Sequence, residues 1–484
     1  MILSLIALIV GGTVLGSIVY GKVKQKRAQS MEDWALGGRK MGLIIFWFLN
    51  AGEIYTTFAV LGISGYAWAY GAPAYLAFCS VSLAATVAYW LTPLIQVYGK
   101  RYGLVTQADF FAHRYASRWL GIGVAAAGIV ALIVYVQIQV TALTLVVSLA
   151  AGPAVTPTGA AFVAVAMMVA FVFLAGLRSA AFAAGVKDVL MLAMVIALAM
   201  TVSDKVGTAS LLDLFATVGE RFPDLVRFPG SQPELGLNVT WLVTSALNVA
   251  LGTYIFPHMF QLCFSADGEN TIRRNAVLQP IYSLSYFFII ALGFAAVLAG
   301  TTVPGGDANA ILLSFVDQNY PAWALGVLAG TAALLALVPG SVLLLTCGSI
   351  FGRNILRSLM PSIAESHELM ASRVSMIGFA LVALWLTLAA SGSLVEIGLS
   401  AYAAIGMLAP GVYAGFLMRK ASAFAVFCGI IAGYAVLWIP AVGRVSSALF
   451  PHWEIGLVAL LVNSLVMVAV SMVAPLRLPR AQTV

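Results

Sequence analysis

A lysine and an aspartate, Lys187 and Asp188, stand side by side in the otherwise uncharged apolar segment SAAFAAGVKDVLMLAMVIALAM. A charge inside a membrane costs about 2.5 kcal/mol or more, so an ionisable side chain at that depth is a functional candidate by default. Because a desolvated ammonium group gives up its proton readily, Lys187 is a candidate for proton coupling. The two residues lie about 100° apart around a helix, which predicts that they do not pair and that Asp188 needs another partner.

Two alternatives to coupling are open for Lys187: a structural ion-pair network, and snorkelling of its side chain to water. Arg178 marks the nearer membrane interface. At about 1.5 Å per residue, Lys187 lies about 13 Å inside a hydrocarbon core about 30 Å thick. A side chain of about 6 Å does not easily reach water from there, so coupling is the favoured interpretation.

The composition is that of a membrane protein. The 484 residues are 62% hydrophobic and 9% charged, with a mean hydropathy of +1.01, far from the usage of soluble domains. The four cysteines have no CxxC spacing, which argues against a disulfide framework or a thiolate metal site. Membrane topology and attraction to anionic membrane lipid explain the net charge of +7, so no nucleic-acid partner is expected.

Apolar segments of about 20 residues recur along the chain, and each is long enough to cross a hydrocarbon core. We predict an all-α polytopic membrane protein with thirteen transmembrane helices in a single transmembrane domain, 1–484. The first segment is kept as a span rather than a signal peptide, because basic residues follow it. The spans lie near 2–21, 42–69, 74–98, 119–149, 159–176, 180–202, 237–263, 277–301, 321–351, 372–391, 395–418, 421–442 and 455–474.

The distribution of Lys and Arg predicts the orientation. Twenty of the 25 basic residues fall in one set of alternate loops. Since cytoplasmic loops carry this excess, we predict a plasma (bacterial inner) membrane protein with its N-terminus outside and its C-terminus in the cytoplasm. One basic loop, TQADFFAHRYASR, is amphipathic, and its Thr106 and Asp109 are spaced like a helix capping box. No chemistry is assigned to it.

Two spans, the second and the seventh, are interrupted by helix-breaking residues. FLNAGEIYTTF (48–58) breaks an apolar run, and ALGTYIFPHMF (250–260) contains Pro257. Transporters often pair two inverted repeats that each open with such a broken helix, so we predict a five-plus-five inverted-repeat (LeuT-like) core. Ordinary glycine and proline kinks are the alternative. The expected parts are span 1 as a peripheral helix, 42–202 as the first repeat, 237–418 as the second and 421–474 as two additional spans.

Longer motifs run through most of the chain: DWALGGRKMG, GLVTQADFFAHRYAS, LAGLRSAAFAAGVKDVLML, FPHMFQLCFSADGENTIRRNAVLQPIYSL and ALVPGSVLLLTCGSIFGRNIL. In these motifs the chain resembles the sodium:solute symporter family. The stretches GLR…VKD, FPHM…IRRNA and ALVP…RNI are most similar to its monocarboxylate-permease branch. The resemblance implies the inverted-repeat fold, alternating access and a solute site at the membrane midplane.

In sodium-coupled members of this family, carbonyls of the first broken helix and two hydroxyls of span 9 hold a Na⁺ ion. The resemblance implies that Ala51 and Ile54 supply the carbonyls, which are the metal ligands if Na⁺ is bound. The hydroxyl pair, however, falls on Val338 and Pro339, which have no side-chain oxygen. The family's sodium site is therefore incomplete in this sequence.

A second departure places Ala184 where the family often has an acidic ion ligand. Lys187 follows three residues later, on the same helix face. Its ammonium group is therefore predicted to replace the metal ion, with H⁺ favoured over Na⁺ as the coupling ion.

Sodium coupling stays open as an alternative. Pro339 frees a backbone carbonyl, and Ser341 or Thr346 could supply oxygens if the helix unwinds locally. Glu53 lies in the first break and is a second coupling candidate, with Asp188 beside Lys187 as a third. No cofactor is expected.

A carboxylate solute is expected beside helix N-termini and hydrogen-bond donors near the two breaks. Each candidate residue has a structural alternative: a hydrogen bond between helices, packing of a tyrosine ring, or, for the histidine, a bond to a carbonyl that the proline frees. The substrate-binding candidates are Tyr55, Tyr135, Gln139, Thr253, Pro257 and His258.

The predicted function is a secondary active symporter that imports a short monocarboxylate. The alternatives are a Na⁺-coupled symporter of a small amino acid or other organic solute, and a membrane sensor that works with a separate signalling partner. An enzyme is not expected, because the four histidines have no HExxH spacing and the sequence contains no GxSxG elbow. The sequence leaves the oligomeric state open.

Overall fold

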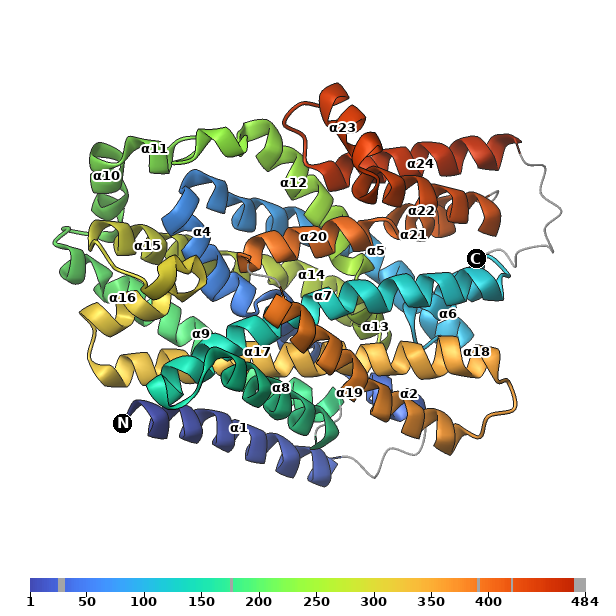
Figure 1. Cartoon of the computed structure of the whole chain (residues 1–484). Coiled ribbons are helices and arrows are strands. Elements are labelled where there is room, and N and C mark those ends of the chain that lie inside the picture. Colours follow the sequence, from blue (N-terminus) through green and yellow to red (C-terminus); the bar gives the residue numbers. More distant parts are fainter. Residues whose placement is uncertain (25–30, 175–176, 390–391, 419–420, 474–484) are drawn as a thin grey trace.

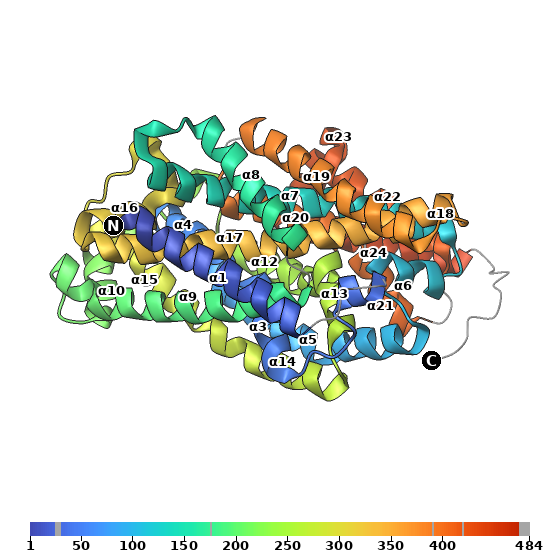
Figure 2. The same ribbon diagram turned by 90° about the horizontal axis from the view of Figure 1, so that it is seen from below.

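The computed structural model describes residues 1–24, 31–174, 177–389, 392–418 and 421–473. Its elements are helices packed into one elongated bundle (Figure 1). α10 (Leu211–Arg221) and α16 (Ile311–Asn319) lie at one end, which we call the α10 end. α6 (Gln107–Arg114) and α18 (Arg357–Leu359) lie at the opposite end, the α6 end, and the perpendicular view agrees (Figure 2).

The other principal helices follow in chain order. They are α1 (Ile2–Lys24), α2 (Met31–Leu36), α3 (Leu43–Ile54), the π-helix η1 (Phe58–Gly62), α4 (Ile63–Tyr70), α5 (Leu76–Tyr102), α7 (Arg118–Ala151), α8 (Pro157–Leu174), α9 (Leu177–Val206), α11 (Pro223–Val226), α12 (Val239–Gly252), the 3₁₀ turn η5 (Thr253–Ile255), α13 (Pro257–Ser265), α14 (Glu269–Ser283), α15 (Ser285–Leu298), α17 (Ala322–Ile350), the π-helix η8 (Phe351–Leu356), α19 (Glu365–Ala389), α20 (Leu394–Gly406), α21 (Ala409–Leu417), α22 (Ala423–Trp438), α23 (Pro440–Leu449) and α24 (Ile455–Val473).

Among the described residues, 8 helices are long and apolar enough to cross a membrane, or up to 12 spans if each bent pair counts as one. α8 is a shorter apolar helix. Each predicted span overlaps one of these helices or bent pairs, and the count of thirteen stays a prediction. The predicted span 421–442 is not straight, because α22 stops at Trp438 and Pro440 starts α23 after a turn of 87°.

The two predicted breaks are confirmed. α3 and the η1–α4 segment are bent by 48°, and α12–η5 and α13 are bent by 50°. At the first break the backbone of Tyr55 leaves the helical region, with φ −93° and ψ 76°. At the second, Pro257 cannot donate a backbone hydrogen bond and begins α13 instead. A further bend of 41° between α20 and α21 was not predicted from the sequence.

α17 forms the centre of the bundle, and all of its residues from Leu328 to Ile350 are buried. It packs against α1, α7, α9 and α19. α1 approaches it closely because Gly326 has no side chain: a Cβ there would lie 2.9 Å from Leu5 Cδ1. Most residues of α1 are exposed or only partly buried, so it lies against the outside of the bundle.

Candidate functional site

The end of α3 leaves a backbone carbonyl available for a ligand. The amide of Tyr55 still donates to the carbonyl of Ala51 at 2.8 Å. Beyond this point the ladder is interrupted, and the chain resumes as a π-helix after Thr57. The carbonyl of Tyr55 accepts a hydrogen bond from Lys187 Nζ at 3.3 Å. A side chain of α9 therefore reaches the unwound backbone of α3.

Lys187 and Asp188 form an ion pair. Lys187 Nζ lies 2.6 Å from Asp188 Oδ1, and both side chains are fully buried. The prediction that the two do not pair was wrong, because the long lysine side chain bends back across the angular separation of the two residues on the helix. Tyr282 of α14 donates to the other oxygen of Asp188 at 3.4 Å. Burial of Lys187 also rules out snorkelling in this conformation.

The carbonyl that Lys187 contacts differs from the expected ones. We expected Ala51 and Ile54, whereas the hydrogen bond goes to Tyr55, one residue beyond Ile54. The Ala51 carbonyl is engaged inside the helix, where it accepts from the Tyr55 amide. Gly52 makes room for the ammonium group, since a Cβ at this position would lie 3.1 Å from Lys187 Nζ.

Span 9 gives no unwound segment for a sodium ion. α17 runs continuously from Ala322 to Ile350 and passes through Pro339. The hydroxyl of Ser341 donates to the carbonyl of Val338 at 2.6 Å, so it is used within the helix. The local unwinding that a hydroxyl ligand from Ser341 or Thr346 would require is not present.

Glu53 and His258 meet across the two breaks. His258 Nε2 lies 4.0 Å from Glu53 Oε2, and both side chains are buried. Within the described parts of the chain, neither oxygen of Glu53 nor Nδ1 of His258 has a hydrogen-bond partner. His258 therefore faces an acidic side chain and not the carbonyl that its structural alternative required.

Gln139 and Tyr135 of α7 lie one helical turn apart near the first break. The Gln139 side-chain carbonyl accepts a hydrogen bond from Thr57 at 3.1 Å, while its amide nitrogen has no partner among the residues described. The Tyr135 ring lies 5.7 Å from the His258 ring, centroid to centroid. Gln139 thus makes a hydrogen bond between helices through its carbonyl oxygen, and its amide N–H groups stay available as donors.

Three other candidates are engaged in local contacts. The hydroxyl of Tyr55 lies 3.2 Å from that of Ser283. Thr253 of η5 donates to the carbonyl of Val249 in the preceding α12 at 2.7 Å. The ring of Pro257 lies against Gly128, where a Cβ would be 3.0 Å from Pro257 Cγ. These contacts give the three residues structural roles in this conformation.

A narrow cavity of about 30 Å³ lies next to the first break. Ile54 lines it, together with four tyrosines: Tyr66, Tyr135, Tyr286 and Tyr402. Of these tyrosines, only Tyr135 was a sequence candidate. Tyr282 of α14, which donates to Asp188, was also missed, although it lies four residues before Tyr286, the spacing of neighbours on a helix face. The rings of both pack against Tyr55, at 5.0 and 5.2 Å.

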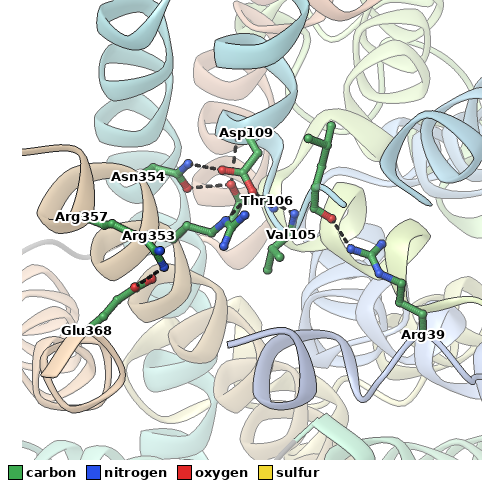
Figure 3. Close-up of polar contacts among 9 residues, drawn as sticks. Arg39, Val105, Thr106, Asp109, Arg353, Asn354, Arg357 and Glu368 are labelled. Atoms are coloured by element: carbon green, nitrogen blue, oxygen red, sulfur yellow. Dashed lines mark hydrogen bonds and ion pairs between the residues drawn. The ribbon is translucent and has the colours of Figure 1, made fainter. Parts of the chain in front are cut away.

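At the α6 end, Asp109 joins two distant parts of the chain (Figure 3). It completes the predicted capping box with Thr106. Its carboxylate also accepts from Arg353 Nε at 2.7 Å and from Asn354 Nδ2 at 2.7 Å, and Thr106 donates to Asn354 at 2.6 Å. We call Thr106, Asp109, Arg353 and Asn354 the Asp109 network. It fixes α6 to η8, the π-helix that follows α17.

Two further contacts tie the α6 end together (Figure 3). Arg357 donates to Glu368 of α19 at 2.9 Å. Arg39, just before α3, donates to the carbonyl of Leu104 at 2.7 Å. In a third contact, the side chain of Gln107 donates to the carbonyl of Ile255 at the second break, at 2.5 Å. The contacts at the α6 end therefore extend to the broken helices.

The family model described as "Sodium:solute symporter family" matches residues 34–433. An uncharacterized symporter of Bacillus subtilis (strain 168), YhjB, is 33% identical over 475 residues, 96% of this chain and 96% of that protein. A second uncharacterized symporter of this organism, YodF, is 26% identical and covers 90% of this chain and 86% of its own length. A monocarboxylate transport permease protein of Rhizobium johnstonii is 27% identical and covers 75% of this chain and 72% of its own length.

Two solved structures are similar in fold. A Na⁺-coupled sialic acid symporter in a substrate-bound outward-open state has a TM-score of 0.79 at 12% identity, over 97% of this chain and 98% of that chain. The nucleobase-cation-symport-1 family transporter Mhp1, in a closed conformation, has a TM-score of 0.55 at 14% identity, over 94% of this chain and 98% of that chain. These similarities show the LeuT-like fold.

Proposed function

Since the chain belongs to the sodium:solute symporter family, we propose that it imports a short monocarboxylate together with protons. Family membership makes it a multi-pass membrane transporter with the LeuT-like inverted-repeat fold and alternating access, and not an enzyme. The solute and the coupling ion are the parts that we propose.

The buried Lys187–Asp188 pair is the observation that carries the proposal for protons. The Lys187 ammonium group contacts the unwound backbone at the end of α3. At the two positions of α17 where the resemblance expects hydroxyl ligands for a sodium ion, the chain has Val338 and Pro339, which have no hydroxyl. In this proposal the fixed ammonium group of Lys187 takes the place of a mobile sodium ion. Because Nζ and Oδ1 are 2.6 Å apart, one proton can be shared between them while the pair stays neutral in the membrane.

We propose that opening of the bundle exposes this pair to water on one side at a time. Proton loss from the pair to the cytoplasm and proton gain from outside would then accompany solute movement. The pair sits against the broken helix, the element that rearranges in alternating access, so its hydration changes with the transport step. Glu53 is placed to act beside it, since it interacts electrostatically with both Lys187 and Asp188.

The name of the Rhizobium relative supports a monocarboxylate as the solute. The site also supports a small solute, because the cavity beside the first break is narrow and lined by tyrosines. In the described part of the chain no arginine side chain is buried, so the carboxylate would be held by neutral donors rather than by a guanidinium group. Such donors suit a small anion that must be released again.

The proposed topology has thirteen spans in the plasma membrane, with the N-terminus outside and the α6 end in the cytoplasm. The first repeat is 42–202 and the second 237–418. The similar bends of 48° and 50° at the start of each repeat support this division.

Uptake into proteoliposomes tests the proposal. Labelled pyruvate and alanine are offered with either a pH gradient or a Na⁺ gradient, to the wild type and to Lys187→Ala. We expect pH-driven pyruvate uptake in the wild type and loss of concentrative uptake in the variant. Lys205→Ala, an exposed lysine on the same helix, is the matched control. Uptake driven by Na⁺ alone and unchanged in Lys187→Ala would refute proton coupling through this residue. Uptake of alanine but not of pyruvate would refute a monocarboxylate as the solute.

A further inference from the structure

Three buried side chains from three helices keep polar atoms without a hydrogen-bond partner among the described residues. They are both oxygens of Glu53 on α3, Nδ1 of His258 on α13 and Nε2 of Gln139 on α7. Buried polar groups are nearly always hydrogen-bonded, because a missing bond costs free energy that water no longer offsets. A set of such atoms in one place indicates a site that is completed by a ligand.

The three groups lie on helices that meet at the first break. His258 Nε2 is 4.0 Å from Glu53 Oε2. The ring of Tyr135, one helical turn before Gln139, is 5.7 Å from the ring of His258. Gln139 also binds Thr57, just past the break from Glu53. Tyr135 and Ile54, the chain neighbour of Glu53, both line the narrow cavity.

The charges around Glu53 favour a neutral carboxylic acid. The titratable groups that face it are His258 from α13, Tyr135 from α7, and Lys187 and Asp188 from α9. Lys187 is already bound to Asp188 at 2.6 Å, so that pair brings no net positive charge. An ionised Glu53 would be a buried carboxylate without a hydrogen-bond donor, which is a costly arrangement.

We propose that Glu53 holds a proton and donates it in a hydrogen bond to the carboxylate of the solute. The amide of Gln139 and an N–H at Nδ1 of His258 are the further donors. This inference rests on the proposed function, because it takes a monocarboxylate as the solute. A carboxylate is an acceptor only, so it satisfies all three donors at once, and each bond to it is charge-assisted. Glu53 thus sets the preference for anionic over cationic solutes.

The proposal makes solute binding dependent on one proton. Binding requires the protonated form of Glu53, so the affinity for pyruvate weakens by up to about tenfold per pH unit once the pH exceeds the point at which Glu53 titrates. Glu53→Gln keeps a donor but cannot titrate. Its affinity is expected to stay within about threefold of the wild-type value at low pH and to be the same at all pH values. Gln139→Ala is expected to weaken binding equally at every pH, since Gln139 carries no titrating proton.

Equilibrium binding of labelled pyruvate to the purified full-length chain between pH 5 and 9 tests this. Binding is measured rather than flux, so that the rate of the transport cycle does not enter. Glu220→Gln, an exposed glutamate on α10, is the control, and size-exclusion chromatography confirms that each variant is folded. Loss of binding in folded Glu53→Gln, or a wild-type affinity that does not change with pH, overturns this inference alone. A wild type that binds no pyruvate overturns the proposed function as well.

Discussion

Lys187 Nζ lies 2.6 Å from Asp188 Oδ1, in an ion pair with no solvent exposure on either side chain. Neighbouring residues on a helix point in different directions, so this contact requires the lysine side chain to bend back toward Asp188. The same ammonium group reaches the Tyr55 carbonyl of another helix. The pair is therefore both a local ion pair and a contact between α9 and the first break.

Asp188→Asn is expected to destabilise the protein, because it leaves a buried ammonium group without its counter-ion. The loss should be about 3 to 5 kcal/mol, measured as the change in thermal unfolding of the detergent-purified protein. Asp224→Asn, an exposed aspartate on α11, should leave the melting temperature unchanged. The double variant Lys187→Met with Asp188→Asn should recover part of the lost stability. Equal losses of stability in the single and double variants would contradict a direct ion pair.

Tyr282→Phe removes the hydroxyl that donates to Asp188 at 3.4 Å. The ring should keep its contacts with Trp47 and Tyr55, at 4.9 and 5.0 Å. We expect a loss of about 1 kcal/mol from the missing hydrogen bond, again measured by thermal unfolding. Tyr89→Phe, on an exposed face of α5, is the matched control. A melting temperature equal to that of the control would show that this hydroxyl does not stabilise Asp188.

Asp109→Ala keeps the Thr106 cap of α6 but removes the carboxylate that accepts from the Thr106 amide, from Arg353 and from Asn354 in the Asp109 network. Loss of the bond from the Thr106 amide alone should cost about 1 kcal/mol. Because the network fixes α6 to η8, we expect the backbone amides of α6 to exchange faster with deuterium than in the wild type. Asp204→Ala, at the far end of α9, should leave α6 protection unchanged. Unchanged exchange in Asp109→Ala would mean that the network does not hold α6.

His113, on α6 between two of the predicted spans, gives a pH dependence. Burial lowers the pKa of His113 below its usual value, and Asp109 opposes this. The unfolded chain therefore takes up the proton first, so stability is full above about pH 6.5 and is lost as the pH falls through the range down to the lowered pKa. His113→Phe keeps the ring contact with Tyr102 and should lose less melting temperature than the wild type between pH 7.5 and 5.5. An identical loss in both proteins would exclude His113 as the source.

Local features of the sequence were enough to predict much of the fold. The apolar segments gave the helices, because the length needed to cross a membrane is a property of each segment alone. The breaks near Glu53 and Pro257 were visible as polar, glycine and proline residues in apolar runs. The capping box of Thr106 and Asp109 was predicted because it depends on residues three apart.

Contacts between distant residues could not be predicted in this way. Glu53 and His258 lie 4.0 Å apart although each belongs to a different broken helix. Tyr282 reaches Asp188 from α14, and Arg353 reaches Asp109 from η8. Each of these contacts depends on how helices pack and on which rotamer a long side chain adopts, and neither is encoded in the spacing of one segment.

The sequence by itself determined that this is a multi-pass helical membrane protein with two broken helices and an ionisable pair at membrane depth. The tertiary structure decided that Lys187 pairs with Asp188 and contacts Tyr55 rather than Ala51 or Ile54, and that Glu53 faces His258. The physical reason is that hydrophobic length and helix breaking are local properties, whereas the partner of a buried charge is set by the helices that close around it.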